Sequence, residues 1–147
     1  MKWPNEVGEV ALSRRETFSA SHRLHNPNFS DEENHRLYGK CNRINGHGHN
    51  YVITVTVIAI PDQETGMIMN ITELKALIHE YVLEKVDHKH LNFDVPELEG
   101  INPTAENLVI VFWHWLAEVI PHSLKFDVEL IETENNSVKY SGPHKSI

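Results

Sequence analysis

The sequence predicts an α+β domain whose main elements follow the order ββααββ. Segments rich in β-branched or alternating apolar residues occur at 9–21, at 49–60 and again from residue 125, and they predict strands. Two segments with helical spacing lie together between the strand pairs instead of alternating with them. That order is typical of antiparallel hairpins with helices packed on the sheet. A chain of 147 residues fits a single domain, 1–147, with a buried core.

The first hairpin encloses a long polar loop. Residues 9–21 predict a strand that leads to His22, and residues 49–60, "HNYVITVTVIAI", predict its partner. Between them, residues 24–46 are rich in Asn, Asp, Pro and Gly, which predicts a loop with a short helix near Glu32. Loops of more than about 15 residues in a compact domain are usually functional.

Two helices are expected in the middle of the chain. After a turn at "PDQETG" and a short returning strand at "MIM", Asn70 precedes Glu73 by three residues, which resembles a capping box. Apolar residues then recur at helical spacing up to Val82. The stretch "VDHKHLNFDVPELEGINP" predicts a loop. A second helix from Pro103 and Thr104 to about Ile120 is apolar nearly all round, so it is expected to be buried on more than one side.

The chain ends with a second hairpin, in which "KFDVELIETE" and "SVKY" predict strands. Composition then limits the function. The net charge of -8 argues against nucleic acid or an anionic membrane as the main partner. A single cysteine excludes an internal disulfide. The N-terminal residues do not predict a signal peptide, and the apolar run "LVIVFWHWL" is too short to span a bilayer. We therefore expect a cytoplasmic protein.

Three histidines predict a metal site. If a strand begins near His47, then His47 and His49 share one face of it. His22 ends the first strand, and hairpin pairing would bring it beside them. Three imidazoles with an open fourth position are typical of a catalytic zinc. The alternative is that His-x-His is accidental in a chain with 11 histidines.

Three further groups have both a functional and an ordinary interpretation. Cys41 is either a small buried apolar residue, a zinc ligand, or a base facing a substrate, with a pKa lowered by nearby positive charge. Asp87 and His88 are an acid/base pair, or His88 merely follows a helix C-terminus. Glu132 continues the apolar face of its strand, so it either reaches solvent or accepts two N–H bonds from a planar ligand.

Taken together, the motifs resemble the 6-pyruvoyl-tetrahydropterin synthase family, a likeness that spans Arg14 to Gly142. They are "FSASH", "GKCNRINGHGHNY", "TGMIMNITELK", "VDHKHLN", "NPTAEN" and "IETENN". The resemblance implies the tunnelling fold (T-fold), an antiparallel ββααββ sheet with two helices on one face. It also implies a homohexamer built as a dimer of trimers, with active sites between subunits.

The resemblance assigns roles to matching positions. The zinc ligands fall on His22, His47 and His49. The general base falls on Cys41, with Asp87 and His88 completing a proton relay from a neighbouring subunit. The pterin ring is anchored by Glu132, helped by Thr104 and Glu106.

The implied reaction is the conversion of 7,8-dihydroneopterin triphosphate to 6-pyruvoyl-tetrahydropterin, with release of triphosphate. Mg²⁺ could accompany the triphosphate, whose charge needs cations from the chain. The candidates near the motifs are Arg14, Arg15, Arg23, Lys40 and Lys139.

Two rival functions stay open on the same residues. One is 6-carboxy-tetrahydropterin synthase of queuosine biosynthesis, in which the cysteine usually lies closer to the His-Gly-His pair. The other is a non-catalytic, zinc-dependent pterin-binding protein. The presence of Cys41, Asp87 and His88 together favours an enzyme.

Overall fold

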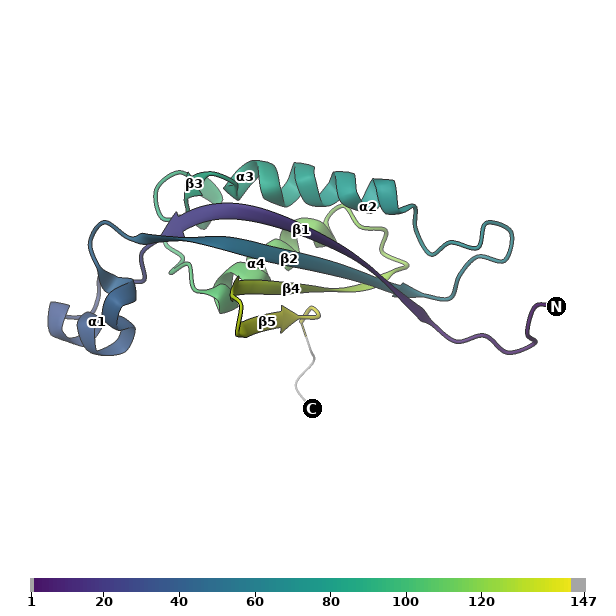
Figure 1. The fold of residues 1–147 in the computed structure, drawn as a ribbon, viewed down its shortest axis with the longest axis horizontal. Helices are drawn as coiled ribbons and strands as arrows, with labels where there is room; N and C mark the ends of the chain where they lie inside the picture. Colours follow the sequence, from purple (N-terminus) through teal and green to yellow (C-terminus); the bar gives the residue numbers. More distant parts are fainter. Residues whose placement is uncertain (1, 144–147) are drawn as a thin grey trace.

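Five strands form one sheet, and the main helices cover one of its faces (Figure 1). The structure is a computed structural model that describes residues 2–143. The strands are β1 (Val10–His22), β2 (His47–Ala59), β3 (Lys89–His90), β4 (Lys125–Thr133) and β5 (Asn136–Tyr140). The helices are α1 (Asp31–Tyr38), α2 (Ile71–Ile78), α3 (Glu84–Val86) and α4 (Ala105–Ala117), with shorter turns η1 (Gly39–Asn42), η2 (His79–Leu83) and η3 (Pro96–Leu98). The α+β class and the ββααββ order of the long elements are confirmed. The predicted domain 1–147 also includes residues 1 and 144–147, which lie outside the described residues.

The strand order in the sheet is β3-β1-β2-β4-β5. β1 and β2 pair antiparallel over their whole length, from Val10 opposite Ala59 to His22 opposite His47. β2 is central because its other edge pairs antiparallel with β4, which in turn pairs with β5. The antiparallel prediction therefore holds for the four long strands. The two-residue β3 pairs parallel to β1, inside a segment for which a loop was predicted.

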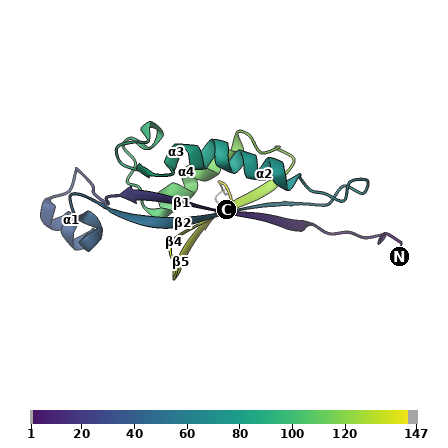
Figure 2. The same cartoon turned by 45° about the horizontal axis from the view of Figure 1, so that its top comes forward.

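The helices α2, α3 and α4 lie together on one side of the sheet, as Figure 2 shows. The first predicted helix is present as α2, a π-helical turn η2 and α3 in succession, and the side chain of Asn70 caps it by accepting a hydrogen bond from the Thr72 N–H (2.9 Å). The second predicted helix is α4, which is capped by Thr104 through the Asn107 N–H (3.2 Å). The expected two helices on one face are thus confirmed. The short helix expected near Glu32 is α1.

The predicted returning strand at Met67–Met69 is wrong. β2 already has a partner on each edge, so this segment has no free edge of β2 to pair with. A tight turn forms instead: the Asp62 N–H donates to the Met67 carbonyl (3.0 Å), and the Asp62 carboxylate accepts from the N–H groups of Glu64 and Thr65. The local hydrogen bonds of Asp62 therefore end the hairpin without a further strand.

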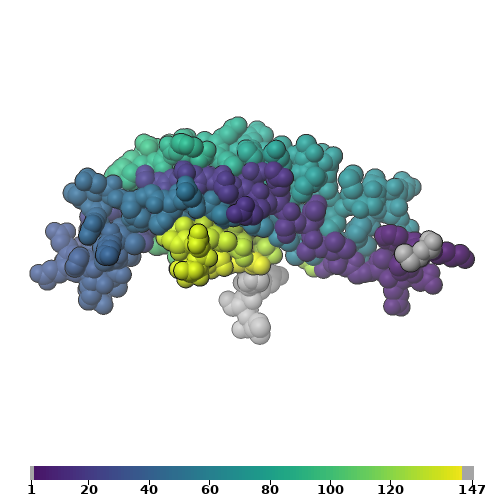
Figure 3. Space-filling model, viewed as in Figure 1, coloured from purple at the N-terminus to yellow at the C-terminus, as the bar shows by residue number. Residues whose placement is uncertain are grey.

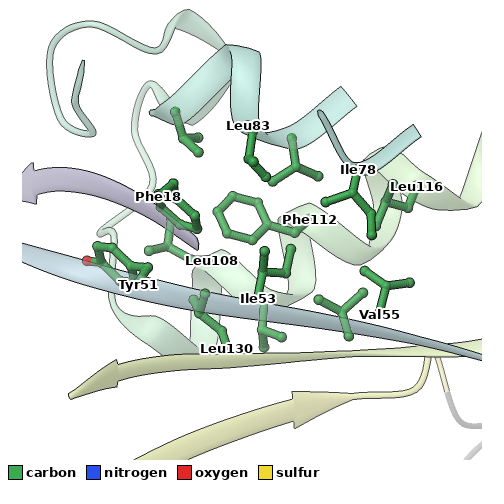
Figure 4. Close-up of a cluster of buried hydrophobic side chains, with 14 of the residues drawn as sticks. Phe18, Tyr51, Ile53, Val55, Ile78, Leu83, Leu108, Phe112, Leu116 and Leu130 are labelled. Carbon is green, nitrogen blue, oxygen red and sulfur yellow. The ribbon is translucent and has the colours of Figure 1, made fainter. Parts of the chain in front are cut away.

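The core lies between the sheet and the helices. Tyr51, Ile53 and Val55 alternate along β2 toward the helices, and Phe112 and Leu116 of α4 pack against them (Figure 4). Burial of these side chains removes apolar surface from water and holds the two layers together. Within residues 2–143, every helix is too short or too polar to cross a bilayer.

The molecule is elongated, and its two ends differ. The loop with α1 lies at one end, and the N-terminal segment lies at the other (Figure 3). The ends of β1 and β2 that carry the histidines lie at the α1 end (Figure 1). Candidate residues from the long polar loop and from both strands therefore meet at that end.

Candidate metal centre

Three imidazoles converge at the α1 end of the sheet. His22 ends β1 directly opposite His47, and His49 lies opposite Ala20. Since side chains alternate along a strand, all three rings point to the helix-covered face. One ring nitrogen from each lies within 4.8 Å of those of the other two, and the Nε2 atoms of His22 and His47 are 3.1 Å apart. The structure thus brings the three predicted ligands into a cluster that can hold a metal ion.

The orientation of His22 is set by its other ring nitrogen. Its Nδ1 lies 2.8 Å from the backbone carbonyl oxygen of Pro103. A carbonyl oxygen can only accept, so Nδ1 carries the proton and donates it. The lone pair of the neutral ring is therefore on Nε2, which faces His47. A ligating histidine normally donates its second N–H in this way.

The electrostatics of the cluster suit a cation. Burial lowers the pKa of His22 to about 4, and it also lowers the pKa of His47, with the charge of His49 adding to that shift. These two rings are therefore neutral at pH 7, as metal ligands must be. The Nε2 atom of His49 is buried and finds no hydrogen-bond partner within residues 2–143. An unpartnered ring nitrogen beside two further imidazoles fits a bound metal ion.

Glu132 lies beside the histidine cluster, at the end of β4. Its Oε1 is 3.4 Å from Nε2 of His49, and its Oε2 is 3.9 Å from Nε2 of His22. The predicted continuation of the apolar face of its strand is thus confirmed. Burial raises the pKa of Glu132, Glu106 raises it further, and His49 opposes them. The carboxylate is partly exposed, so a ligand can reach it.

Thr104 and Glu106 lie at the N-terminus of α4, just after the carbonyl that orients His22. The Thr104 hydroxyl accepts a hydrogen bond from the Asn107 N–H, so it caps the helix, and its own O–H donates to no group within residues 2–143. Glu106 lies near enough to Glu132 to raise its pKa. Glu106 is therefore near Glu132, and Thr104 directly follows Pro103, whose carbonyl contacts His22.

Cys41 lies on η1, between α1 and β2, and is half-buried. Its carbonyl accepts a hydrogen bond from the Leu24 N–H (2.9 Å), two residues beyond His22. Burial raises the pKa of Tyr51, and the charges of Glu132 and Cys41 raise it further. Cys41 therefore lies within electrostatic reach of the core that supports the cluster. Within residues 2–143, the group that could hold a metal ion consists of the three histidines and does not include Cys41.

Asp87 and His88 do form a pair. Oδ1 of Asp87 lies 2.9 Å from Nδ1 of His88 and accepts a hydrogen bond from the Ser19 N–H (2.9 Å). The His88 N–H donates to the Ser19 carbonyl (2.6 Å), and His88 has φ 60, a left-handed conformation uncommon for a non-glycine residue. Burial alone would raise the pKa of Asp87, but the hydrogen bonds from Ser19 and His88 lower it overall.

This pair does not face the histidine cluster of its own chain. It lines a groove of about 370 Å³ with Thr17, Ser19 and Asn50. Those residues alternate with His22 and Tyr51 along β1 and β2, so the groove opens on the opposite face of the sheet. The His88 side chain is 82% exposed. Within one chain, the pair and Cys41 are therefore not assembled into one relay.

Two partners of His22 were not predicted. The Pro103 carbonyl has no side-chain signature in a sequence. Tyr51, whose hydroxyl is 3.4 Å from Nδ1 of His22, follows the alternation of His47 and His49 and was identifiable from it.

The chain is similar to known proteins of one family. Residues 11–143 match the family described as 6-pyruvoyl tetrahydropterin synthase. The chain is 51% identical over 133 residues to the 6-pyruvoyl tetrahydrobiopterin synthase of Dictyostelium discoideum, covering 90% of this chain and 96% of that one. The solved structure of Caenorhabditis elegans 6-pyruvoyl tetrahydropterin synthase superposes with a TM-score of 0.87 at 37% identity, covering 92% of this chain and 97% of that one.

A protein with the rival function is also similar. The 6-carboxy-5,6,7,8-tetrahydropterin synthase of a Synechocystis strain is 35% identical over 124 residues, covering 80% of this chain and 92% of that one. The match over 11–143, the high identity and the shared fold nevertheless agree on one assignment. This chain belongs to the 6-pyruvoyl tetrahydropterin synthase family.

Proposed function

We propose that the protein is a zinc-dependent lyase that converts 7,8-dihydroneopterin triphosphate to 6-pyruvoyl-tetrahydropterin and releases triphosphate. One observation carries the proposal: Glu132 lies 3.4 Å from Nε2 of His49, at the edge of a cluster of three imidazoles. A carboxylate that recognises a pterin and a metal that activates its side chain would thus be neighbours. The single domain 1–147 is part of the proposal.

The three imidazoles would hold zinc and leave a fourth position open. When bound, zinc would supply Lewis-acid polarisation of the substrate side chain and so acidify its C–H bonds. The protein's own residues supply the rest of the site. By holding Nδ1 of His22, the Pro103 carbonyl would leave the Nε2 lone pair available to zinc. Glu132, with Thr104 and Glu106, would hold the pterin ring by hydrogen bonds to its N–H groups.

Cys41 would act as the general base that removes a side-chain proton, while triphosphate leaves with its bonding electrons. A positioned base of this kind contributes roughly 10²–10⁴-fold to the rate. The proton would then pass to the Asp87–His88 pair. With Nδ1 of His88 directed at Asp87 (2.9 Å), Nε2 of the neutral ring would be the acceptor.

The proton relay requires a second copy of the chain. Asp87 and His88 lie on the face opposite to the histidine cluster, which supports a site completed by a neighbouring subunit. We therefore include a homohexamer, a dimer of trimers, in the proposal. Light scattering should give about six times the 16.9 kDa mass of one chain.

Of the five predicted triphosphate cations, two lie next to Cys41. Lys40 directly precedes it, and Nε of Arg23 donates to the Asn42 carbonyl (2.8 Å). Arg14 is already engaged by Glu16 (2.7 Å). Lys40 and Arg23 are therefore the favoured triphosphate partners, with Mg²⁺ accompanying the phosphates. The proposed location is the cytoplasm, since one cysteine makes no use of an oxidising compartment.

Product analysis tests this function directly. The purified protein is incubated with 7,8-dihydroneopterin triphosphate, and the pterin product is identified by mass. We expect 6-pyruvoyl-tetrahydropterin and free triphosphate. Release of a two-carbon aldehyde with 6-carboxy-tetrahydropterin would identify the rival enzyme. Tight binding of the substrate without turnover would identify a pterin-binding protein.

A further inference from the structure

The thiol of Cys41 has little local support. It lies on η1, a single turn of four residues without a side-chain cap at its start. The hydrogen bond that closes the turn, from the Arg43 N–H to the Lys40 carbonyl, is long at 3.4 Å. Short 3₁₀ turns have poor hydrogen-bond geometry. Contacts from outside the turn must therefore determine where the thiol lies.

Those contacts come from the residues that directly follow His22. The Leu24 N–H donates to the Cys41 carbonyl (2.9 Å), and the side-chain amide of Asn42 donates to the Leu24 carbonyl (2.8 Å). Nε of Arg23 donates to the Asn42 carbonyl (2.8 Å). The turn is thus tied in both directions to a segment that begins one residue after a metal-cluster histidine.

Asn42 also reaches a second support of the cluster. The second N–H of the Asn42 amide donates to Nδ1 of His25 (2.9 Å). An amide nitrogen can only donate, so Nδ1 is the acceptor and the ring proton of His25 is on Nε2. The backbone N–H of His25 donates to Oδ1 of Asn102 (3.3 Å). Asn102 directly precedes Pro103, whose carbonyl orients His22. The Asn42 side chain therefore connects the turn of Cys41 to both segments that hold His22.

The segment is itself anchored. The Asn92 side chain accepts from the Arg23 N–H (2.8 Å) and donates to the Arg23 carbonyl (2.9 Å). Leu24 and His25 follow directly, so the acceptors of the Asn42 amide are held in place from a third part of the chain. Because these acceptors are fixed, the hydrogen bonds of the Asn42 amide also fix the position of the turn that contains Asn42 and Cys41.

We propose that Asn42 is a positioning residue that holds the Cys41 thiol in register with the histidine cluster. The inference rests on the proposed role of Cys41 as the base. It assigns no contact with substrate to Asn42. Reacting groups must be placed within a few tenths of an ångström, and a misplacement of about 1 Å can lower a rate by roughly 100-fold.

The test compares Asn42→Ala with Asn28→Ala. Asn28 is an exposed residue of the same loop whose side chain makes no hydrogen bond within residues 2–143. We expect Asn42→Ala to lower kcat by about 10- to 100-fold. Zinc content and the Kd for unphosphorylated 7,8-dihydroneopterin should stay within about twofold, because Asn92 and the Pro103 carbonyl hold Arg23 and His22 without Asn42. Exchange of the Leu24 amide hydrogen should accelerate at least about tenfold, because the turn that accepts it opens more often. Asn28→Ala should change none of these.

A double-variant cycle separates this inference from the proposed function. If Asn42 acts only through the thiol, Cys41→Ala/Asn42→Ala should turn over at the rate of Cys41→Ala. A further drop in the double variant would overturn the inference. Full activity of Cys41→Ala would instead remove the proposed function of the thiol, and the inference with it. An inactive Cys41→Ala beside a fully active Asn42→Ala with a fast Leu24 amide would overturn the inference alone.

Asn42→Asp covers the case in which alanine unfolds the loop. It keeps the size of the side chain but cannot donate to the Leu24 carbonyl. Its kcat should fall while its thermal unfolding stays close to that of Asn28→Ala. Unchanged kcat in this variant would also overturn the inference.

Discussion

The buried His22 should make the metal-free protein sensitive to mild acid. Its pKa is lowered from 6.5 to about 4 in the folded protein because the ring is buried. The unfolded chain therefore binds a proton that the folded chain excludes. A lowered pKa in the folded state means that this contribution to stability is present above about pH 6.5 and is lost as the pH falls toward 4.

The size of the effect follows from the two pKa values. With 6.5 for the unfolded and about 4 for the folded state, the linkage relation gives a loss of about 2 kcal/mol between pH 7.5 and pH 5. The full difference, about 3 kcal/mol, is reached only below pH 4. Protonation of carboxylates with lowered pKa values, such as Glu16 and Asp87, also decreases the free energy of unfolding at lower pH. A variant is therefore needed to separate the contribution of His22.

His22→Asn is the matched variant. Its amide can donate to the Pro103 carbonyl in place of Nδ1, but it does not titrate. Urea unfolding of both proteins, treated with a chelator, is measured at pH 7.5, 6 and 5. The stability difference between wild type and His22→Asn should shift by about 2 kcal/mol over this range, with wild type losing more. A difference that stays constant with pH would refute the reasoning about the buried imidazole.

Three further predictions concern the site. His47→Ala should lose most of the bound zinc in metal analysis, because two imidazoles remain; full zinc occupancy would exclude His47 as a ligand. Glu132→Gln should weaken binding of 7,8-dihydroneopterin by about 1.5–3 kcal/mol in a fluorescence titration, since an N–H replaces an acceptor; unchanged affinity would mean that the carboxylate merely reaches solvent. Cys41→Ala should keep its zinc and its pterin affinity but lose most turnover; zinc loss in proportion to activity would make Cys41 a ligand instead.

Much of the fold was predictable from local patterns. The β-branched residues of 49–60 predict the central strand, and the polar caps Asn70 and Thr104 mark the starts of α2 and α4. The two-residue β3 was not predictable, because its only signal is pairing with Ala20 and Ser21, far away in the sequence. The strand expected at Met67–Met69 failed for a similar reason, since its intended neighbour already had two partners.

The site divides in the same way. Alternation along a strand is a property of backbone geometry, so the spacing of residues alone places His49 on one face with Tyr51. The position of Glu132 beside the cluster also depends on the register shift between Ile131 and Thr133. The meeting of His22 with His47 depends instead on hairpin register across a loop of 24 residues.

The sequence by itself determined which residue types form the candidate site and that His47 and His49 share one face of their strand. The tertiary structure decided that His22 lies opposite His47, that the Pro103 carbonyl sets its tautomer, and that Asp87 and His88 open onto the opposite face. The physical reason is the range of the interactions. Periodicity and capping come from dihedral angles and hydrogen bonds within a few residues. The register between strands and the face on which a loop residue lies come from contacts between segments that are distant in the sequence. Bringing such segments together costs loop-closure entropy, and only burial of the complete core offsets that cost.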